Sequence, residues 1–313
     1  MTGTIVLDES CNAENDSREL KKAMKGIGTD EAAIIKILSN RTVEQRLDIC
    51  TKFKKMYGKS LKTELKSELS SHFLKLVKSL ILPVPQLLAK EAHRAIKTSM
   101  PHSLIEVLIG MDNRSLNELK IFYIQKFNVS IERDLGGMLN VSSGYKRLVL
   151  AILQGSRNES EIPDPALAEQ DAKDLSEAGP NRFGTEDPVF NALLASRGYE
   201  HLKLVFAEYR VEAYEDIGES IRSEMIGEHQ EIYLQIVNLI RRPTACFAEA
   251  LFKIMKGVGT DDDELIRVIV WRSEIDLEEI KVEFGRLLDR SLSDYISDET
   301  SGDYRSLLLA IVK

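Results

Sequence analysis

Apolar residues recur at helical spacing through the first eighty residues of the chain. They lie three or four positions apart within five short stretches, a spacing that places side chains on one face of a helix. The five sets are Leu20, Ala23, Met24; Ile34, Ile37, Leu38; Leu47, Cys50, Phe53, Tyr57; Leu61, Leu65, Leu69; and Phe73, Leu74, Val77, Leu80, Ile81. Strand-like alternation bounded by hairpin turns is nowhere convincing. The pattern therefore predicts an all-α fold with five short helices in this unit.

An arginine-containing dipeptide marks the same unit four times. The copies are Arg41-Thr42, Arg114-Ser115, Arg197-Gly198 and Arg272-Ser273, at intervals of 73, 83 and 75 residues. A fixed internal period is the signature of a repeat protein. In three copies Gln45, Glu118 or Asp276 stands three positions after the hydroxyl, which predicts a capping box and a helix start. These intervals predict four units of about 70 residues.

Proline-rich and polar segments separate these units. Pro83 and Pro85 interrupt the chain after the first unit, and the longer stretch 155–165 separates the second from the third. That longer linker suggests two halves, one holding the first two units and the other the last two. We expect a tail over 1–16, repeat 1 over 17–83, repeat 2 over 84–156, a linker over 157–166, repeat 3 over 167–241 and repeat 4 over 242–313.

The most specific signal in the chain couples a glycine loop to a distant carboxylate. Residues 24–29, Met-Lys-Gly-Ile-Gly-Thr, return at 255–260 with one change, and an acid, Glu68 or Glu299, lies forty residues after the second glycine. A looser copy at 179–185 is followed at the same distance by Glu224. With 50 acids in 313 residues, three chance hits have a probability of (50/313) cubed, about 0.004. One copy alone would indicate only a helix stop and cap, but the coupled set indicates a metal site.

Residues of these types suit calcium. Ca²⁺ takes six to eight oxygen ligands in flexible geometry, and a glycine at positive φ turns backbone carbonyls outward without a Cβ clash. Each site supplies one carboxylate, which leaves net positive charge and open positions for water or a phosphoryl oxygen. The ion can then bridge an acidic protein to an acidic membrane, and several weak bridges gain avidity. We therefore expect calcium as the cofactor and calcium-dependent binding to anionic phospholipid membranes.

Over essentially its whole length the chain resembles the annexin family. The resemblance rests on the four repeats, on the pattern M-K-G-x-G-T followed about forty residues later by an acid, and on Thr300-Ser301-Gly302 after the last acid. It implies a curved disk of four repeats of five short helices, with the calcium loops facing the membrane. It also implies a preference for phosphatidylserine and other anionic lipids.

The resemblance implies three main calcium sites, each built from backbone carbonyls and one carboxylate. The implied ligands are Met24, Gly26, Gly28 and Glu68 in repeat 1; Gly179, Arg182, Gly184 and Glu224 in repeat 3; and Met255, Gly257, Gly259 and Glu299 in repeat 4. A weaker neighbouring site would use a threonine carbonyl and an acid. Those pairs are Thr29 with Glu31, Thr185 with Asp187, and Thr260 with Asp262.

Residues beside these ligands are candidates for lipid contact. Phe183 lies at the tip of the third loop, where it either dips into the interfacial lipid or folds back to pack. Lys25 and Lys256 either contact phosphates or simply complement the dipole at a helix C-terminus. Residues 18–80 hold fifteen Lys or Arg against seven Asp or Glu. This basic segment is either a set of solvated helix faces or an attraction for anionic headgroups.

Repeat 2 departs from the pattern. Residues 97–101, Lys-Thr-Ser-Met-Pro, stand in place of the glycine loop, and Val141 or its neighbour Asn140 stands at the acidic position. We therefore expect no calcium site in repeat 2. A loop adapted to a protein partner is the alternative.

Composition narrows the remaining function classes. A net charge of −8 argues against general nucleic-acid binding, and Cys11, Cys50 and Cys246 form no CxxC pair. The five histidines show no metal spacing and no nucleophile motif is recognisable, so we expect no enzyme. No apolar run could span a bilayer and residues 1–10 do not form a signal peptide. We expect a cytoplasmic and peripheral membrane location, with unconventional export to the cell surface left open.

Other hypotheses for the function of the chain stay open. The chain could be a calcium-gated helical scaffold for protein partners, and self-association on the membrane is also open. Glu91, Arg114, Arg267 and Arg272 match positions that line a polar passage in the family, which makes weak ion conduction a second hypothesis. Buried ion pairs with a structural role are the alternative for these residues, and Trp271, beside Arg272, is expected in the core.

Overall fold

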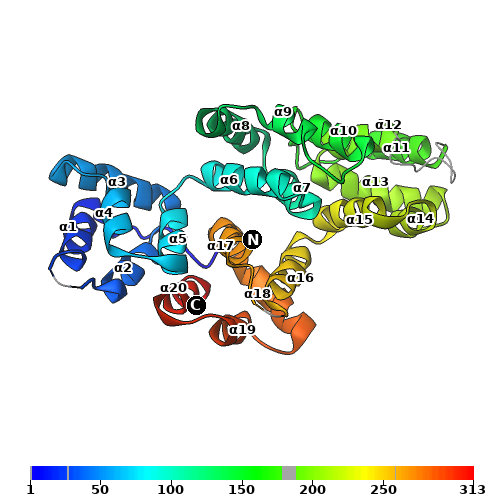
Figure 1. The fold of residues 1–313 in the computed structure, drawn as a ribbon. Helices are drawn as coiled ribbons and strands as arrows, with labels where there is room; N and C mark the ends of the chain where they lie inside the picture. Colours follow the sequence, from blue (N-terminus) through cyan, green and yellow to red (C-terminus); the bar gives the residue numbers. More distant parts are fainter. Residues whose placement is uncertain (1, 27, 178–187, 258) are drawn as a thin grey trace. The chain divides into compact units, whose positions relative to one another are not determined.

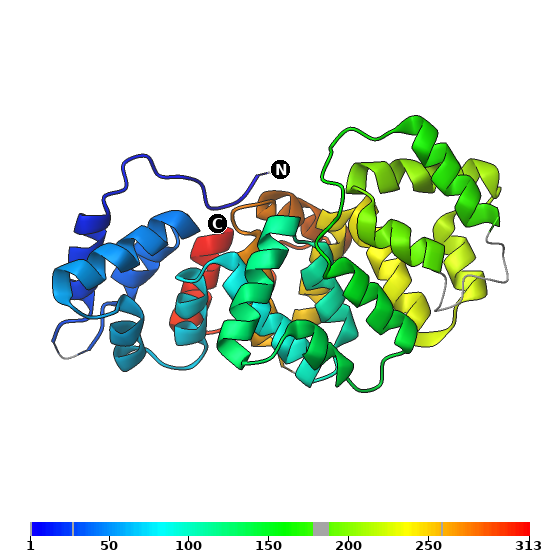
Figure 2. The ribbon, with the colours of Figure 1, turned by 90° about the horizontal axis from the view of Figure 1, so that it is seen from above.

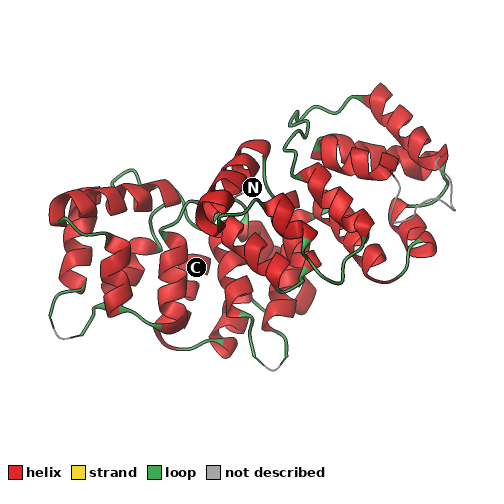
Figure 3. Cartoon of the chain, turned by 45° about the horizontal axis from the view of Figure 1, so that its top comes forward, coloured by secondary structure: helices red, strands yellow, loops and turns green. Residues whose placement is uncertain are grey.

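The computed structural model describes residues 2–26, 28–177, 188–257 and 259–313, and Figure 1 traces them as a ribbon. In these residues the regular structure consists of twenty α-helices with no strand (Figure 3), which confirms the all-α prediction. Repeat 1 holds α1 (Ala13–Ala23), α2 (Glu31–Leu38), α3 (Val43–Tyr57), α4 (Leu61–Glu68) and α5 (Ser71–Leu80). Repeat 2 holds α6 (Val84–Lys97), α7 (Pro101–Ile109), α8 (Asn113–Phe127), α9 (Ile131–Gly136) and α10 (Ser143–Ile152).

The other two repeats have the same order of helices. Repeat 3 holds α11 (Pro165–Glu177), α12 (Pro188–Ser196), α13 (Tyr199–Glu212), α14 (Ile217–Glu224) and α15 (Gly227–Arg241). Repeat 4 holds α16 (Pro243–Met255), α17 (Asp262–Arg272), α18 (Leu277–Leu288), α19 (Leu292–Glu299) and α20 (Gly302–Val312). Five helices therefore recur in each repeat, as the sequence period predicts.

The chain divides into two compact units, and their composition corrects the predicted halves. One unit comprises residues 1–87 and 244–313, which are repeats 1 and 4, and the other comprises residues 88–243, which are repeats 2 and 3. In the first unit α17 packs on α5, and α20 packs on α2 and α5. In the second, α15 packs on α7 and α12 on α10. Linker length therefore did not identify which repeats share a core.

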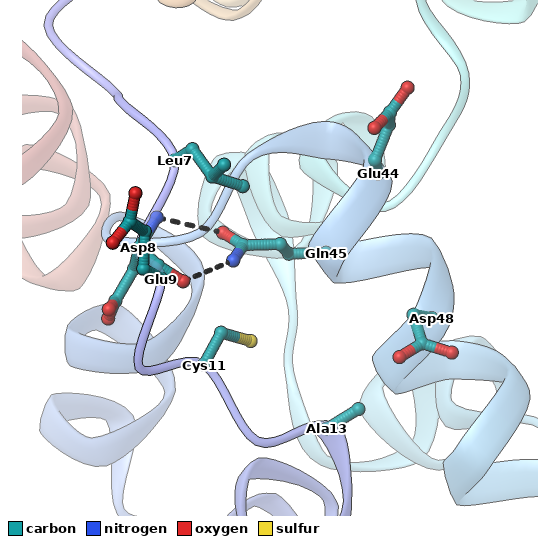
Figure 4. Close-up of a pocket in the computed structure, with 8 residues that line it drawn as sticks. All are labelled: Leu7, Asp8, Glu9, Cys11, Ala13, Glu44, Gln45 and Asp48. Atoms are coloured by element: carbon teal, nitrogen blue, oxygen red, sulfur yellow. Dashed lines mark hydrogen bonds between the residues drawn. The ribbon is translucent and has the colours of Figure 1, made fainter.

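The N-terminal segment ties repeat 1 to repeat 4 (Figure 2). The amide of Ile5 donates to the carbonyl of Ser273 at 2.9 Å, and Glu278 N donates to Thr2 O at 3.2 Å. Figure 4 shows where this segment passes α3 over a cavity of about 550 Å³. There Gln45 Nε2 donates to Asp8 O at 2.7 Å. The predicted tail is therefore fixed in place by hydrogen bonds at both ends.

Capping explains where α3 begins and corrects two further predictions. Thr42 and Gln45 form the predicted capping box. In repeat 2, however, Asp112 is the cap and accepts from Ser115 N at 2.6 Å, so α8 starts before the predicted hydroxyl. In repeat 4, Ser273 is the C-cap of α17, and the N-cap of the next helix, α18, is Asp276 instead. The Asp276 carboxylate accepts from Arg272 Nε at 2.7 Å, and that ion pair takes the place of a side-chain capping hydrogen bond.

The buried face of α3 also differs from the predicted one. Leu47, Cys50 and Tyr57 are only half-buried, whereas Arg46 and Ile49 are buried beside Phe53. The apolar pattern could not find this face because it counts arginine as a surface residue. Elsewhere in repeat 1 the predicted residues of α1, α2 and α4 lie in the core.

Candidate calcium sites

The α1–α2 connection in repeat 1 has the backbone that the glycine pattern predicts. Gly26 has φ +113° and Gly28 has φ +87°, values that other residues rarely adopt. Both are exposed, while Met24 before them is buried. The loop closes where Asp30 N donates to Ala23 O at 2.9 Å, and Asp30 caps α2 by accepting from Ala33 N. Glycine geometry and capping therefore hold an exposed loop between two helices.

The α16–α17 connection in repeat 4 adopts the same conformation independently. Gly257 has φ +121° and Gly259 has φ +92°. Asp261 N donates to Ile254 O at 3.2 Å, and Asp261 caps α17 by accepting from Glu264 N at 3.0 Å. Two segments about 230 residues apart thus fold into one shape, because the same glycine spacing imposes the same positive φ angles.

The three coupled acids occupy one structural position. Glu68, Glu224 and Glu299 are the last residues of α4, α14 and α19, and each is followed by a residue in extended conformation. In repeat 1 the acid meets the loop, since Thr29 Oγ1 donates to Glu68 Oε2 at 3.4 Å. In repeat 1 the forty-residue spacing therefore brings the loop and the carboxylate within hydrogen-bonding distance.

An open cavity of about 290 Å³ is lined by the predicted carboxylates of both the main and the weaker site of repeat 1. Glu68 and Glu31 line it together with Ser301 and Asp303 of repeat 4. The predicted ligand Asp262 lies at the start of α17, where His72 Nδ1 is 3.0 Å from its Oδ2.

The donors fit a calcium ion better than zinc. Among the described residues, no hydrogen bond ends on the carbonyls of Gly26, Gly28, Gly257 or Gly259, which leaves these oxygens available. Thr260 Oγ1 is buried with no hydrogen-bond partner in the same described part of the chain. No group of three His, Cys, Asp or Glu side chains within it could hold a metal. Carbonyl-rich sites with one carboxylate match the oxygen preference of calcium.

Repeat 2 lacks both halves of this arrangement. Only three residues join α6 to α7, and the turn is closed by Met100 N donating to Ala95 O at 2.8 Å, with Ser99 at φ +53°. Helix α9 ends at Gly136, four residues before Asn140. Repeat 2 therefore has neither an exposed glycine loop between its first two helices nor an acid at the end of its fourth helix, and the lack of a calcium site there stays a prediction.

Most of the repeat 3 loop lies outside the described residues. The predicted ligands Gly179, Arg182 and Gly184, the weaker pair Thr185 and Asp187, and the lipid-contact candidate Phe183 all fall there. The structure places only Glu224 of this set, at the end of α14, where it is half-buried.

The four residues matched to a polar passage have partners within their own repeats. Arg267 pairs with Glu264 and Arg272 with Asp276, and both arginines are buried. Arg94 Nε donates to Glu91 Oε2 at 3.0 Å, and Arg114 pairs with Glu118 at 3.0 Å on the surface. Trp271 is 3% exposed, as expected for a core residue. Across the described residues, no helix is both long and apolar enough to cross a membrane.

Sequence and structure comparisons agree with these features. The family model Annexin matches residues 15–80, 170–236 and 246–311, ranges that leave out repeat 2. Human annexin A13 is 41% identical over 303 residues, covering 96% of this chain and 95% of that protein. The solved structure of annexin III is 37% identical with a TM-score of 0.93, covering 100% of this chain and 97% of the other. Calcium-bound annexin (Sm)1 is 29% identical with a TM-score of 0.90, covering 99% and 93%. The chain belongs to the annexin family, which is known for calcium-dependent phospholipid binding.

Proposed function

We propose that this chain binds anionic, phosphatidylserine-containing membranes through calcium ions that bridge its repeat loops to lipid phosphoryl groups. The observation that carries the proposal is the repeated geometry of repeats 1 and 4. Each places two exposed positive-φ glycines in the first interhelical loop and an exposed glutamate at the end of the fourth helix. In repeat 1 the Thr29–Glu68 hydrogen bond brings the two together. Members of the family are generally binding proteins without enzymatic activity.

Charge balance explains why calcium and lipid would bind together. Each loop offers neutral carbonyls and a single carboxylate, so a bound ion keeps about one unit of positive charge. The protein itself carries −8, and without the ion it would be repelled by an anionic surface. Phosphoryl oxygens complete the calcium shell and the ion cancels the repulsion between the two surfaces. Weak sites on one chain then add through avidity.

Residues beside the loops suit contact with headgroups. Lys25 and Lys256 are exposed next to the first glycine of each loop, and Lys256 Nζ lies 5.2 Å from the centre of the Phe252 ring. Lysines at these positions add electrostatic attraction to anionic lipid. The weaker pairs, Thr29 with Glu31 and Thr260 with Asp262, would supply further oxygen ligands at the same surface.

Co-sedimentation with phosphatidylserine vesicles across a calcium titration tests this function. We expect binding that appears with calcium and reverses with a chelator. The double variant Glu68→Gln/Glu299→Gln should need several-fold more calcium. The matched control Glu14→Gln/Glu278→Gln removes the same charge from surface acids that pair with Arg18, Lys52 and Lys281, and should bind as the parent does.

Two outcomes would contradict the proposal. If the Glu68/Glu299 variant binds vesicles at the parental calcium level, these acids are not the ligands. If calcium produces no binding to pure lipid, and binding needs a membrane protein, the scaffold function replaces the lipid-binding one.

A further inference from the structure

A small cavity in the unit formed by repeats 1 and 4 shares no lining residue with the candidate calcium sites. Its volume is about 210 Å³. The walls come from the start of α3, the end of α5 and the turn after α17. Its lining residues are Val43, Arg46, Leu80, Leu82, Val84, Val270, Trp271, Glu274 and Ile275. Seven of these nine side chains are apolar, and the other two, Arg46 and Glu274, form an ion pair at 3.3 Å, so the cavity is a hydrophobic chamber with one charged wall.

In this charged wall Arg46 is only 1% exposed. Its Nε donates to Leu38 O at 2.8 Å, and its Nη1 lies 3.3 Å from both Leu80 O and Glu274 Oε1. Nη2 is buried and has no hydrogen-bond partner within the described part of the chain. A buried donor without a partner is costly, and a buried guanidinium is normally satisfied on every nitrogen.

The guanidinium has a counter-ion in the same cavity wall, Glu274. Burial lowers the pKa of Arg46 to about 10, although Glu274 opposes this shift. Burial raises the pKa of Glu274 and nearby Glu44 raises it further, whereas Arg46 and the Val43 amide lower it. Glu274 Oε1 is also shared with the amide of Val43, which donates to it at 2.7 Å. With Glu274 paired to Nη1, Arg46 Nη2 is the donor of this guanidinium that a further oxygen acceptor would satisfy.

We propose that this chamber binds a small apolar carboxylate, with the carboxylate accepting a hydrogen bond from Arg46 Nη2 and the apolar part filling the space beside Trp271. An apolar cavity of roughly 150 Å³ is large enough for benzene, so 210 Å³ accommodates a ring or short acyl chain with a carboxylate attached. Charge-assisted hydrogen bonds to a buried guanidinium are stronger than neutral ones. The head group thereby determines which molecules bind, and the hydrophobic walls supply the affinity.

The only tryptophan of the chain lines this cavity, so binding has a built-in optical signal. Benzoate is the probe, and fluorescence is excited at a wavelength that benzoate does not absorb. Benzyl alcohol and benzylammonium have the same ring with a neutral and a positive head. We expect a saturable fluorescence change with benzoate, binding about tenfold weaker or more for the alcohol, and no saturable change for the ammonium.

Two variants and one control locate the site. Arg46→Gln should abolish benzoate binding, whereas Arg18→Gln, the same change at a surface arginine paired with Glu14, should leave it unchanged. Because Arg46 also bonds two carbonyls, Arg46→Gln could fail to fold, which a thermal melt would reveal. Ile275→Phe is the second variant; it keeps Arg46 and fills the chamber from a residue that is 38% exposed, so it should block benzoate without unfolding the protein.

Three results would overturn the inference. Equal binding of benzyl alcohol and benzoate would show that the chamber selects apolar volume and ignores charge. Parental benzoate binding by folded Ile275→Phe would place the probe elsewhere. No saturable change at millimolar benzoate would mean that water alone satisfies Arg46. Calcium-dependent vesicle binding is measured on the same variants, and its persistence in them separates this site from the proposed membrane function.

Discussion

Replacing a loop glycine with alanine should separate backbone strain from packing. Gly28 and Gly259 have φ of +87° and +92°, and among the described residues a Cβ added at either position would meet no atom within 4 Å other than those of its chain neighbours. No steric clash is created, so the cost comes only from holding an alanine at positive φ, about 1–2 kcal/mol. Each loop will either keep the alanine at positive φ, with lower stability, or relax its backbone toward negative φ. Relaxation would turn the carbonyls away from the calcium position.

At Gly285 the same substitution to alanine is expected to raise stability instead of lowering it. This glycine lies inside α18, its φ is not positive, and an added Cβ again meets nothing within 4 Å. Alanine is favoured over glycine in a helix interior by roughly 0.5–1 kcal/mol, so Gly285→Ala should stabilise the protein. The three variants thus share one chemical change and differ only in backbone conformation.

Thermal unfolding in chelator and calcium titration of vesicle binding measure the two effects. If the alanine is held at positive φ, we expect Gly28→Ala and Gly259→Ala to melt up to a few degrees below the parent. If the loop relaxes, we expect the parental melting temperature. Either way they should need several-fold more calcium for half-maximal binding. Gly285→Ala should melt higher and bind at the parental calcium level. An unchanged calcium requirement in both loop variants would refute the role of positive φ in presenting the carbonyls.

Three further predictions concern single positions. Ser71, the first residue of α5, has φ +53°, and the corresponding first residues of α15 and α20 are Gly227 and Gly302 with φ near +60°. Ser71→Gly should increase the free energy of unfolding by about 1 kcal/mol and so raise the melting temperature. Asp216 accepts two 3.0 Å bonds from Arg241, which lowers its pKa. The ion pair stabilises the protein above the unfolded-state pKa of Asp216, and this stabilisation is lost as pH falls through the folded-state pKa. Asp216→Asn should therefore lower the melting temperature at pH 7, and the difference from the parent should shrink below about pH 4. A difference in melting temperature that stays constant across pH would contradict this. Asn140→Asp or Val141→Asp should restore no calcium binding to repeat 2 in isothermal titration, because the three-residue α6–α7 turn lacks the glycine loop.

The loop geometry was predictable because its causes are local. Gly26 and Gly28 fix their own backbone, and Asp30 caps the next helix within three residues. The acids Glu68, Glu224 and Glu299 were predicted from their constant spacing after the glycine, and in the structure each is the last residue of the fourth helix of its repeat. Repetition made this possible, since one copy of the motif would have had several explanations and three in register had one.

Pairing of the repeats was not predictable in the same way. Repeats 1 and 4 share a core because α17 and α20 pack on helices of repeat 1. Helix α17 is buried at every residue from 264 to 272, and α20 buries an apolar face. Any repeat could in principle offer such helices a partner, so the pattern of apolar residues carries no information on which one does. The length of the linker between repeats 2 and 3 is a weak guide, because loops of different length can join the same neighbours.

Arg46 shows where the limit of sequence reasoning has functional meaning. A hydrophobicity pattern assigns arginine to the surface, and the basic character of residues 18–80 supported that assignment. The guanidinium is instead buried by partners 34 and 228 residues away, Leu80 and Glu274, which no local window contains. Sequences usually violate the inside–outside rule where a buried charge has a use, since it costs stability to keep one. A buried arginine with an unsatisfied nitrogen beside an apolar chamber is such a violation, and ligand binding is the use that would offset its cost.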